Sequence, residues 1–309
     1  MIKPKRLEPG LTIGIVSPSY WLDKDKLNKT IKYYRGLGYR IKIGSSNNLR
    51  EGPFSGSPLA RASDINNMFA DPNINAIFCT RGGYGANRLL QLLDYELIRK
   101  NPKIFIGFSD ITALLLSITQ KTNLITFHGP MLISNENRFI NYNHRTMVQV
   151  LGGSKQENIL APNKSPAKIL NPGIGTGKLW GGNITLIINR IGTIDQLDTH
   201  NAILFLEDVD EYIYSFERMF IHLQTAGVFE NIKGLIIGEL HNFKDQEIPF
   251  NKNTDEIVMD ICGHLDIPII TNYPCGHGEY QCTLPLSIPV ELNAMDKKPY
   301  IRFTENAVL

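Results

Sequence analysis

Strand-like and helix-like patterns alternate through the first half of the chain, and this alternation limits the possible folds more than any other feature. Short apolar runs rich in β-branched and aromatic residues lie at Leu11–Val16, Tyr39–Ile43, Ala76–Cys79, Ile104–Phe108 and Leu124–Phe127. Helical periodicity lies between them, at Lys24–Leu37, Ala60–Phe69, Ala86–Arg99 and Ile111–Thr119. Such alternation is typical of βαβ units. We therefore expect an α/β fold with a mostly parallel sheet.

The middle of the chain changes character. Residues 153–177 are rich in Gly, Pro, Ser, Asn and Lys and have no clear helical or strand period, which predicts a linker. Beyond it, apolar runs and helical patterns return, at Ala202–Leu206, Ile213–Ala226, Leu235–Leu240, Asp255–His264, Pro268–Thr271 and Ile288–Leu292. We expect an N-terminal α/β domain at 1–152 and a second, mixed α/β domain at 178–309.

The overall composition excludes some classes of partner. The chain has 309 residues, 42% of them hydrophobic and 20% charged, and a formal net charge of +2, which is too small to indicate nucleic acid or an anionic membrane. No apolar run is long enough to span a bilayer. The first apolar run is interrupted by Gly14 and Pro18, so it does not resemble a signal peptide, and we expect a cytoplasmic protein.

The four cysteines, Cys79, Cys262, Cys275 and Cys282, are few for a chain of this length and are expected to be reduced thiols. Cys275 and Cys282 lie near His277, but their spacing matches no paired C-x-x-C zinc site. We expect neither a metal nor a cofactor.

Parallel sheets bind ligands where strands end, and the polar turn GFSD follows the run at Ile104. A serine there would lie near a helix N-terminus, where free N–H groups favour developing negative charge, so Ser109 is a candidate nucleophile. Ser109 or Asp110 would serve equally well as a helix cap, and no G-x-S-x-G motif is present. The local sequence leaves both interpretations open and favours the cap.

Three further stretches offer catalytic groups. Adjacent glycines in TRGGYGA, Gly82 and Gly83, let a backbone approach a ligand and can form an oxyanion hole, although a simple strand-to-helix turn explains them as well. Glu207 follows an apolar strand, and His277 lies in a loop between two glycines. Together with Ser109 they supply a nucleophile, an orienting acid and a general base. His128 in FHGP is a weaker candidate.

Six motifs then carry a resemblance through nearly the whole chain: GFSDITALLL, RGGYGANRLLQLLDYELI, TFHGPM, WGGNITLI, LEDVDEYIYSFERM and CGHGEYQCTLPL. Taken together and in this order, they resemble the LD-carboxypeptidases of serine peptidase family S66. The resemblance implies a cytoplasmic serine peptidase that removes terminal D-alanine from murein tetrapeptides in cell-wall recycling. It also implies a flavodoxin-like N-terminal domain, a smaller β-rich C-terminal domain, an active site between them and a homodimer.

The resemblance assigns roles motif by motif. By motif position, the resemblance implies that Ser109 is the nucleophile, Glu207 the acid and His277 the base. It also implies an oxyanion hole made by the backbone N–H of Asp110 and of one glycine, Gly83 or its neighbour Gly82. No metal is implied. For the carboxylate of the substrate, Arg81 is a candidate on chemical grounds.

The chain departs from the family in two places. The family commonly has GHGxxNxxLPLG, whereas this chain reads GHGEYQCTLPLS. Trp180 directly precedes GGN and suggests an alternative resemblance, to the sister group of microcin-C immunity peptidases. Those enzymes cleave aminoacyl-nucleotide antibiotics and place an aromatic ring against the nucleobase. A core or interface tryptophan is the simpler interpretation. A third reading is a catalytically silent ligand-binding protein, which has no need of Ser109, Glu207 and His277 together.

Overall fold

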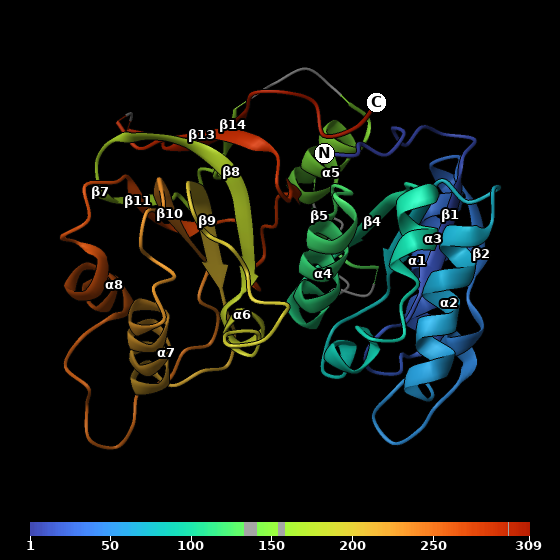
Figure 1. The fold of residues 1–309 in the computed structure, drawn as a ribbon, viewed down its shortest axis with the longest axis horizontal. Helices are drawn as coiled ribbons and strands as arrows, with labels where there is room; N and C mark the ends of the chain where they lie inside the picture. The colour runs from blue at the N-terminus through green and yellow to red at the C-terminus, as the bar shows by residue number, and fades with distance from the viewer. Residues whose placement is uncertain (133–140, 154–157, 296) are drawn as a thin grey trace. The chain divides into compact units, whose positions relative to one another are not determined.

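The structure is a computed structural model that describes residues 1–132, 141–153, 158–295 and 297–309. It divides into two compact units, each with its own sheet (Figure 1). The first unit comprises residues 1–155, 283–286 and 306–309, and the second comprises residues 156–282 and 287–305. The division is therefore not a single cut along the sequence, because two short C-terminal segments return to the first unit.

The first unit contains a six-stranded sheet with strand order β12-β5-β4-β3-β1-β2. Its strands are β1 (Thr12–Val16), β2 (Arg40–Ile43), β3 (Ala76–Cys79), β4 (Ile104–Gly107), β5 (Phe127–His128) and β12 (Leu284–Pro285). Neighbouring strands are parallel except at the edge, where β12 runs antiparallel to β5. The predicted parallel sheet is confirmed.

Helices cover both faces of this sheet. They are α1 (Lys24–Gly36), α2 (Pro58–Ala70), α3 (Tyr95–Lys100), α4 (Thr112–Thr122) and α5 (Asn141–Leu151), with short 3-10 helices η1 (Ser45–Asn48), η2 (Ala86–Leu89) and η3 (Ser109–Ile111). Phe78 of β3 packs on Tyr34 of α1, whereas a side chain at Gly14 of β1 would meet Met68 of α2. Gly14 pairs with Ile77, so both point to the same face of the sheet, and Phe78, the next residue of β3, points to the other face. Helices α1 and α2 therefore lie on opposite faces of the sheet.

The second unit is built on an eight-stranded mixed sheet, with order β6-β14-β13-β8-β9-β10-β11-β7. Its strands are β6 (Ile159–Leu160), β7 (Lys168–Asn171), β8 (Ile174–Asn183), β9 (Ala202–Glu207), β10 (Gly234–Gly238), β11 (Ile269–Tyr273), β13 (Pro289–Asn293) and β14 (Tyr300–Phe303). The central strands β8 to β11 are parallel, and the outer pairings are antiparallel. The helices in the described residues of this unit are α6 (Ile184–Ile188), α7 (Ile213–Thr225) and α8 (Thr254–Cys262). The predicted fold class is confirmed.

The segment predicted as a linker, residues 153–177, contributes strands to the sheet. Positions 154–157 lie outside the described residues, but β6, β7 and the start of β8 fall in the rest of this segment. The glycines there reflect close packing of strands: a Cβ at Gly175 would stand 2.0 Å from the carbonyl oxygen of Lys233, and one at Gly177 would stand 2.3 Å from that of Asn201. Glycine in a strand interior often marks such a close approach.

The predicted helix at Ala86–Arg99 is two helices, η2 and α3, because Asp94 caps α3 through the backbone N–H of Leu97. Within the described residues, no helix has the length and apolar character needed to cross a membrane.

Candidate active site

Ser109 lies in the turn that follows β4, a central strand of the first unit. It is the first residue of η3, which leads directly into α4. Its φ of 61° lies in the left-handed region, which costs a non-glycine residue on the order of 1 kcal/mol. The N-cap positions of η3 and α4 belong to Phe108 and Ile111, so the helix-cap interpretation does not account for Ser109. Strain of this kind clusters at functional positions and supports the nucleophile interpretation.

The glycine pair of RGGYG lies beside this turn. A Cβ at Gly82 would stand 3.1 Å from Oγ of Ser109 and 3.4 Å from the backbone nitrogen of Asp110. Gly83 has a φ of +116°, and a Cβ there would stand 2.5 Å from the ring of Tyr20. The backbone at Gly83 therefore favours glycine, a side chain at Gly82 would be crowded by Ser109, and the RGGYG backbone can approach the Ser109 turn closely. The role of Gly83 as an oxyanion-hole donor stays a prediction.

Arg81 precedes the glycine pair and is half-buried. Its Nη1 donates to the carbonyl oxygen of Trp21 at 3.3 Å, and its guanidinium carbon lies 5.5 Å from the ring centroid of Tyr20. These contacts position the guanidinium group of Arg81, the residue directly before Gly82. Whether Arg81 binds the substrate carboxylate stays a prediction.

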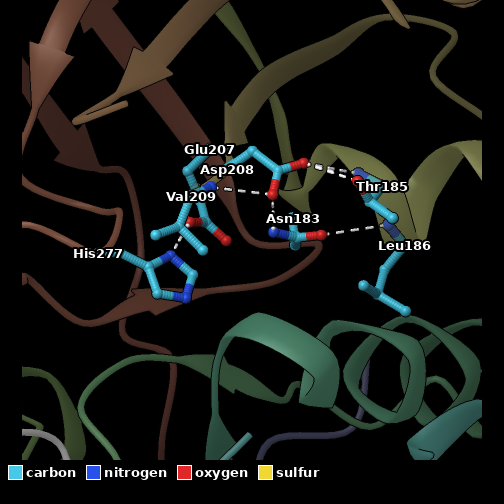
Figure 2. Close-up of polar contacts among 7 residues, drawn as sticks. All are labelled: Asn183, Thr185, Leu186, Glu207, Asp208, Val209 and His277. Carbon is cyan, nitrogen blue, oxygen red and sulfur yellow. Dashed lines mark hydrogen bonds and ion pairs between the residues drawn. The ribbon is translucent and has the colours of Figure 1, made fainter. Parts of the chain in front are cut away.

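The second unit brings Glu207 and His277 together. Glu207 ends β9 with a fully buried side chain, and its Oε2 lies 2.7 Å from Nδ1 of His277, whose side chain is 14% exposed (Figure 2). A carboxylate at Nδ1 accepts that nitrogen's proton in a hydrogen bond, so Nε2 becomes the basic nitrogen of the imidazole. Ser109 belongs to the first unit, so the complete triad stays a prediction.

Asp208, next to Glu207, anchors the end of β8. Its carboxylate accepts four hydrogen bonds, from Nδ2 of Asn183 at 2.8 Å, from Thr185 N at 3.0 Å and Oγ1 at 2.9 Å, and from Val209 N at 2.9 Å (Figure 2). Burial and the Glu207 carboxylate raise the pKa of Asp208 to about 6, although these hydrogen bonds lower it. Acidic residues just before a helix, as Asp208 is before α7, commonly cap that helix. Instead, Asp208 contacts the start of α6, which precedes it in the chain.

The glycines on either side of His277 are explained by Glu239. A Cβ at Gly276 would stand 2.4 Å from the carbonyl oxygen of Glu239, and a Cβ at Gly278 would overlap its carboxylate. The same carboxylate accepts a hydrogen bond of 2.8 Å from Oγ of Ser165, which lies in the predicted linker. Sequence reasoning missed both Glu239 and Ser165, because neither belongs to a recognisable motif.

His128 and the four cysteines, the weaker candidates in the sequence, are buried side chains. His128 is fully buried in β5, and its ring packs edge-on against Phe108 at 5.9 Å between centroids, as a core histidine does. All four cysteines are buried free thiols. Across the described ranges, no group of three or more His, Cys, Asp or Glu side chains could hold a metal ion.

Comparison with known proteins identifies the family. The sequence profile of the LD-carboxypeptidase N-terminal domain matches residues 13–129, and that of the C-terminal domain matches residues 176–292. The chain belongs to the LD-carboxypeptidase family, peptidase family S66. The resemblance seen in the six motifs is confirmed, and the protein is a carboxypeptidase-type hydrolase.

The proteins similar to this LD-carboxypeptidase family member are named either as carboxypeptidases or as immunity proteins. A probable murein peptide carboxypeptidase of Bacillus subtilis is 31% identical over 304 residues, which is 97% of this chain and 94% of the relative. The structure of the microcin C7 self-immunity protein MccF with aspartyl sulfamoyl adenosine has a TM-score of 0.93 at 27% identity and covers all of both chains. The muramoyltetrapeptide carboxypeptidase of Oxalobacter formigenes has a TM-score of 0.82 at 25% identity, covering 94% of this chain and 98% of its own.

The structure explains one departure from the family pattern. Ser287 stands where LD-carboxypeptidases commonly have the last glycine of LPLG, and its φ is 64°, a value that favours glycine. This chain adopts the left-handed conformation there with a serine. Trp180 lies in β8, half-buried and in register with Leu204 of β9. A role of Trp180 against a ligand stays a prediction.

Proposed function

We propose that this chain is a serine LD-carboxypeptidase that releases terminal D-alanine from murein tetrapeptides. The observation that carries the proposal is the buried Glu207 carboxylate bonded to Nδ1 of His277 at 2.7 Å. That arrangement prepares an imidazole to accept a proton at Nε2, which a serine nucleophile needs near neutral pH. The murein substrate is supported by the name of the Bacillus relative.

In this mechanism Oγ of Ser109 attacks the carbonyl carbon of the residue before D-alanine, and His277 takes the hydroxyl proton. The backbone N–H groups of Asp110 and Gly83 stabilise the tetrahedral oxyanion. His277 then gives the proton to the departing amine of D-alanine, and water hydrolyses the acyl-enzyme with His277 again as base. Arg81 is our candidate for holding the carboxylate of the D-alanine.

The test compares the wild type with Ser109→Ala on L-Ala-γ-D-Glu-L-Lys-D-Ala and on its meso-diaminopimelate counterpart. D-alanine and tripeptide are followed by mass spectrometry without added metal. Release by the wild type alone supports the reaction and reveals which diamino acid is preferred. If the wild type releases D-alanine from neither peptide, the murein assignment fails.

The second candidate is cleavage of aminoacyl or peptidyl nucleotide conjugates, as in the microcin-C immunity peptidases. It is favoured by the TM-score of 0.93 with the MccF complex, against 0.82 for the muramoyltetrapeptide carboxypeptidase. Aspartyl sulfamoyl adenosine is the direct substrate for this test. Its cleavage without activity on tetrapeptides would select this function, and Trp180→Ala should then raise KM if the ring holds the nucleobase.

We also propose a cytoplasmic homodimer that acts in peptidoglycan recycling, with the nucleophile and the acid–base pair contributed by different domains of one chain. Light scattering after size exclusion tests the dimer, and cell fractionation tests the location. A monomer, or a protein recovered outside the cytoplasm, contradicts these points but leaves the chemistry untouched.

A further inference from the structure

We propose that Arg61 and Asp110 are positioning residues that hold the Ser109 turn and the RGGYG loop in a fixed relation. The inference rests on the proposed role of Ser109 as nucleophile. It concerns the first unit alone, and it assigns a reaction-related role to a side chain that no sequence motif singled out.

Arg61 is a cation enclosed by backbone. It lies in α2 and is 0% exposed, and burying a charge is costly unless it is paired or hydrogen-bonded. Its Nε donates to the carbonyl oxygen of Gly56 at 3.1 Å, and its Nη1 donates to those of Pro18 and, at 3.2 Å, of Gly85. A single side chain thus joins the loop after β1, the loop before α2 and the loop after β3.

Asp110 joins the same loops to the turn after β4. It is 2% exposed, and its Oδ2 accepts from Oγ of Ser19 at 2.5 Å and from the backbone N–H of Ala86 at 2.9 Å. Ser19 is next to Pro18, and Ala86 is next to Gly85. Arg61 and Asp110 therefore hold adjacent residues on two of the same loops.

The charges of the two groups favour this arrangement. Burial lowers the pKa of Arg61, and the nearby Asp110 carboxylate opposes that change. Burial raises the pKa of Asp110, while its hydrogen bonds and then Arg61 lower it. Each group therefore stabilises the ionised form of the other in a site that excludes water.

This scaffold surrounds the groups that the reaction needs. Ser109 precedes Asp110 directly and has a strained φ of 61°, which persists only where neighbouring structure imposes it. Gly82, where an added Cβ would stand 3.1 Å from Oγ of Ser109, belongs to the loop that Arg61 and Asp110 hold at Gly85 and Ala86. If the loop moves relative to the turn, the two proposed oxyanion donors separate, and a misplacement of about 1 Å can cost about a hundredfold in rate.

The test measures how fast a fluorophosphonate labels Ser109, by intact-protein mass spectrometry, in Arg61→Gln and in the milder Ser19→Ala. The matched control is Lys103→Met. Lys103 is also a buried cation that donates to backbone carbonyls, those of Met68 at 2.9 Å and of Asp71, but it precedes β4 and so lies at the opposite end of that strand from Ser109.

We expect labelling to slow by about 10- to 100-fold in Arg61→Gln and by a few-fold in Ser19→Ala, with kcat falling in parallel and KM little changed. Lys103→Met should lower the melting temperature but keep the labelling rate within about twofold of the wild type. Folded Ser19→Ala and Arg61→Gln proteins that label like the wild type overturn the inference, and so does an equal loss in Lys103→Met. A wild type in which Ser109 is never labelled and no D-alanine is released overturns instead the proposed function.

Discussion

Replacing Glu207 by glutamine isolates the contribution of one carboxylate to the proposed chemistry. Glu207 is fully buried, and its Oε2 lies 2.7 Å from Nδ1 of His277. Glutamine has nearly the same size, but its amide N–H₂ group can donate to Nδ1. The imidazole proton would then move to Nε2, and that nitrogen could no longer accept the proton of Ser109.

The expected loss is large. The equivalent change in a Ser-His-Asp triad lowers kcat by about 10⁴, which corresponds to about 5 kcal/mol of transition-state stabilisation. The matched control is Glu291→Gln, since Glu291 is a carboxylate in the same unit that pairs with the Arg302 cation at 2.9 Å. That pair is partly exposed, so its loss should cost less than about 1 kcal/mol of folding stability and leave turnover unchanged.

Both variants are assayed for kcat and KM by release of D-alanine from the preferred tetrapeptide, beside thermal melts that establish folding. We expect Glu207→Gln to melt near the wild type and to lose kcat far more than it changes KM. A folded Glu207→Gln protein that keeps more than roughly a tenth of wild-type kcat would refute the reasoning, since a triad acid cannot be dispensable.

Three further predictions follow, one on activity and two on stability. In Gly276→Ala the new Cβ would stand 2.4 Å from the backbone carbonyl oxygen of Glu239, so the backbone beside His277 must shift. We expect kcat to fall at least about tenfold, and unchanged kcat counts against the contact. The pKa of Asp208 is about 6 in the folded chain against 3.8 ordinarily, so the folded state holds the Asp208 proton more tightly than the unfolded state does. The resulting gain in folding stability is complete below about pH 4 and is lost as the pH rises through 6. Urea unfolding should show a loss of about 3 kcal/mol over that range, and Asp208→Asn, which cannot ionise, should lack it; parallel pH curves would contradict the assignment. Ser287→Gly relieves a left-handed φ of 64° and should change the unfolding free energy by less than about 1 kcal/mol. Ser287→Val places a β-branched residue at that φ and should lower the unfolding free energy by more than about 1 kcal/mol. Equal melting temperatures for the two variants would show that the backbone angle at Ser287 does not limit stability.

Much of the first unit could be predicted because its signals are local. The predicted helix at Lys24–Leu37 agrees with α1, and the predicted strand at Ala76–Cys79 agrees with β3. Both follow from periodicity within neighbouring residues. The end of β4 before Ser109 was visible for the same reason, since an apolar run stops at a polar turn.

The strands around the predicted linker could not be predicted, because their pattern depends on distant partners. The glycines of β8 pack against the backbone of residues far along the chain, such as Asn201, and their lack of side chains removes the alternation that identifies a strand. A segment that is tightly packed in the sheet therefore has the composition of a flexible one.

The sequence by itself determined the α/β class, the family, and the residue types available for catalysis at the ends of strands, because motifs and periodicity lie within short stretches of chain. Only the tertiary structure decided the contacts of Glu207 with His277, of Glu239 with the flanking glycines, and of Arg61 with three separate loops. All of those contacts except that of Arg61 with Gly56 join residues far apart in the chain. Their geometry depends on strand order and on how closely two backbones approach, and neither is encoded in local sequence.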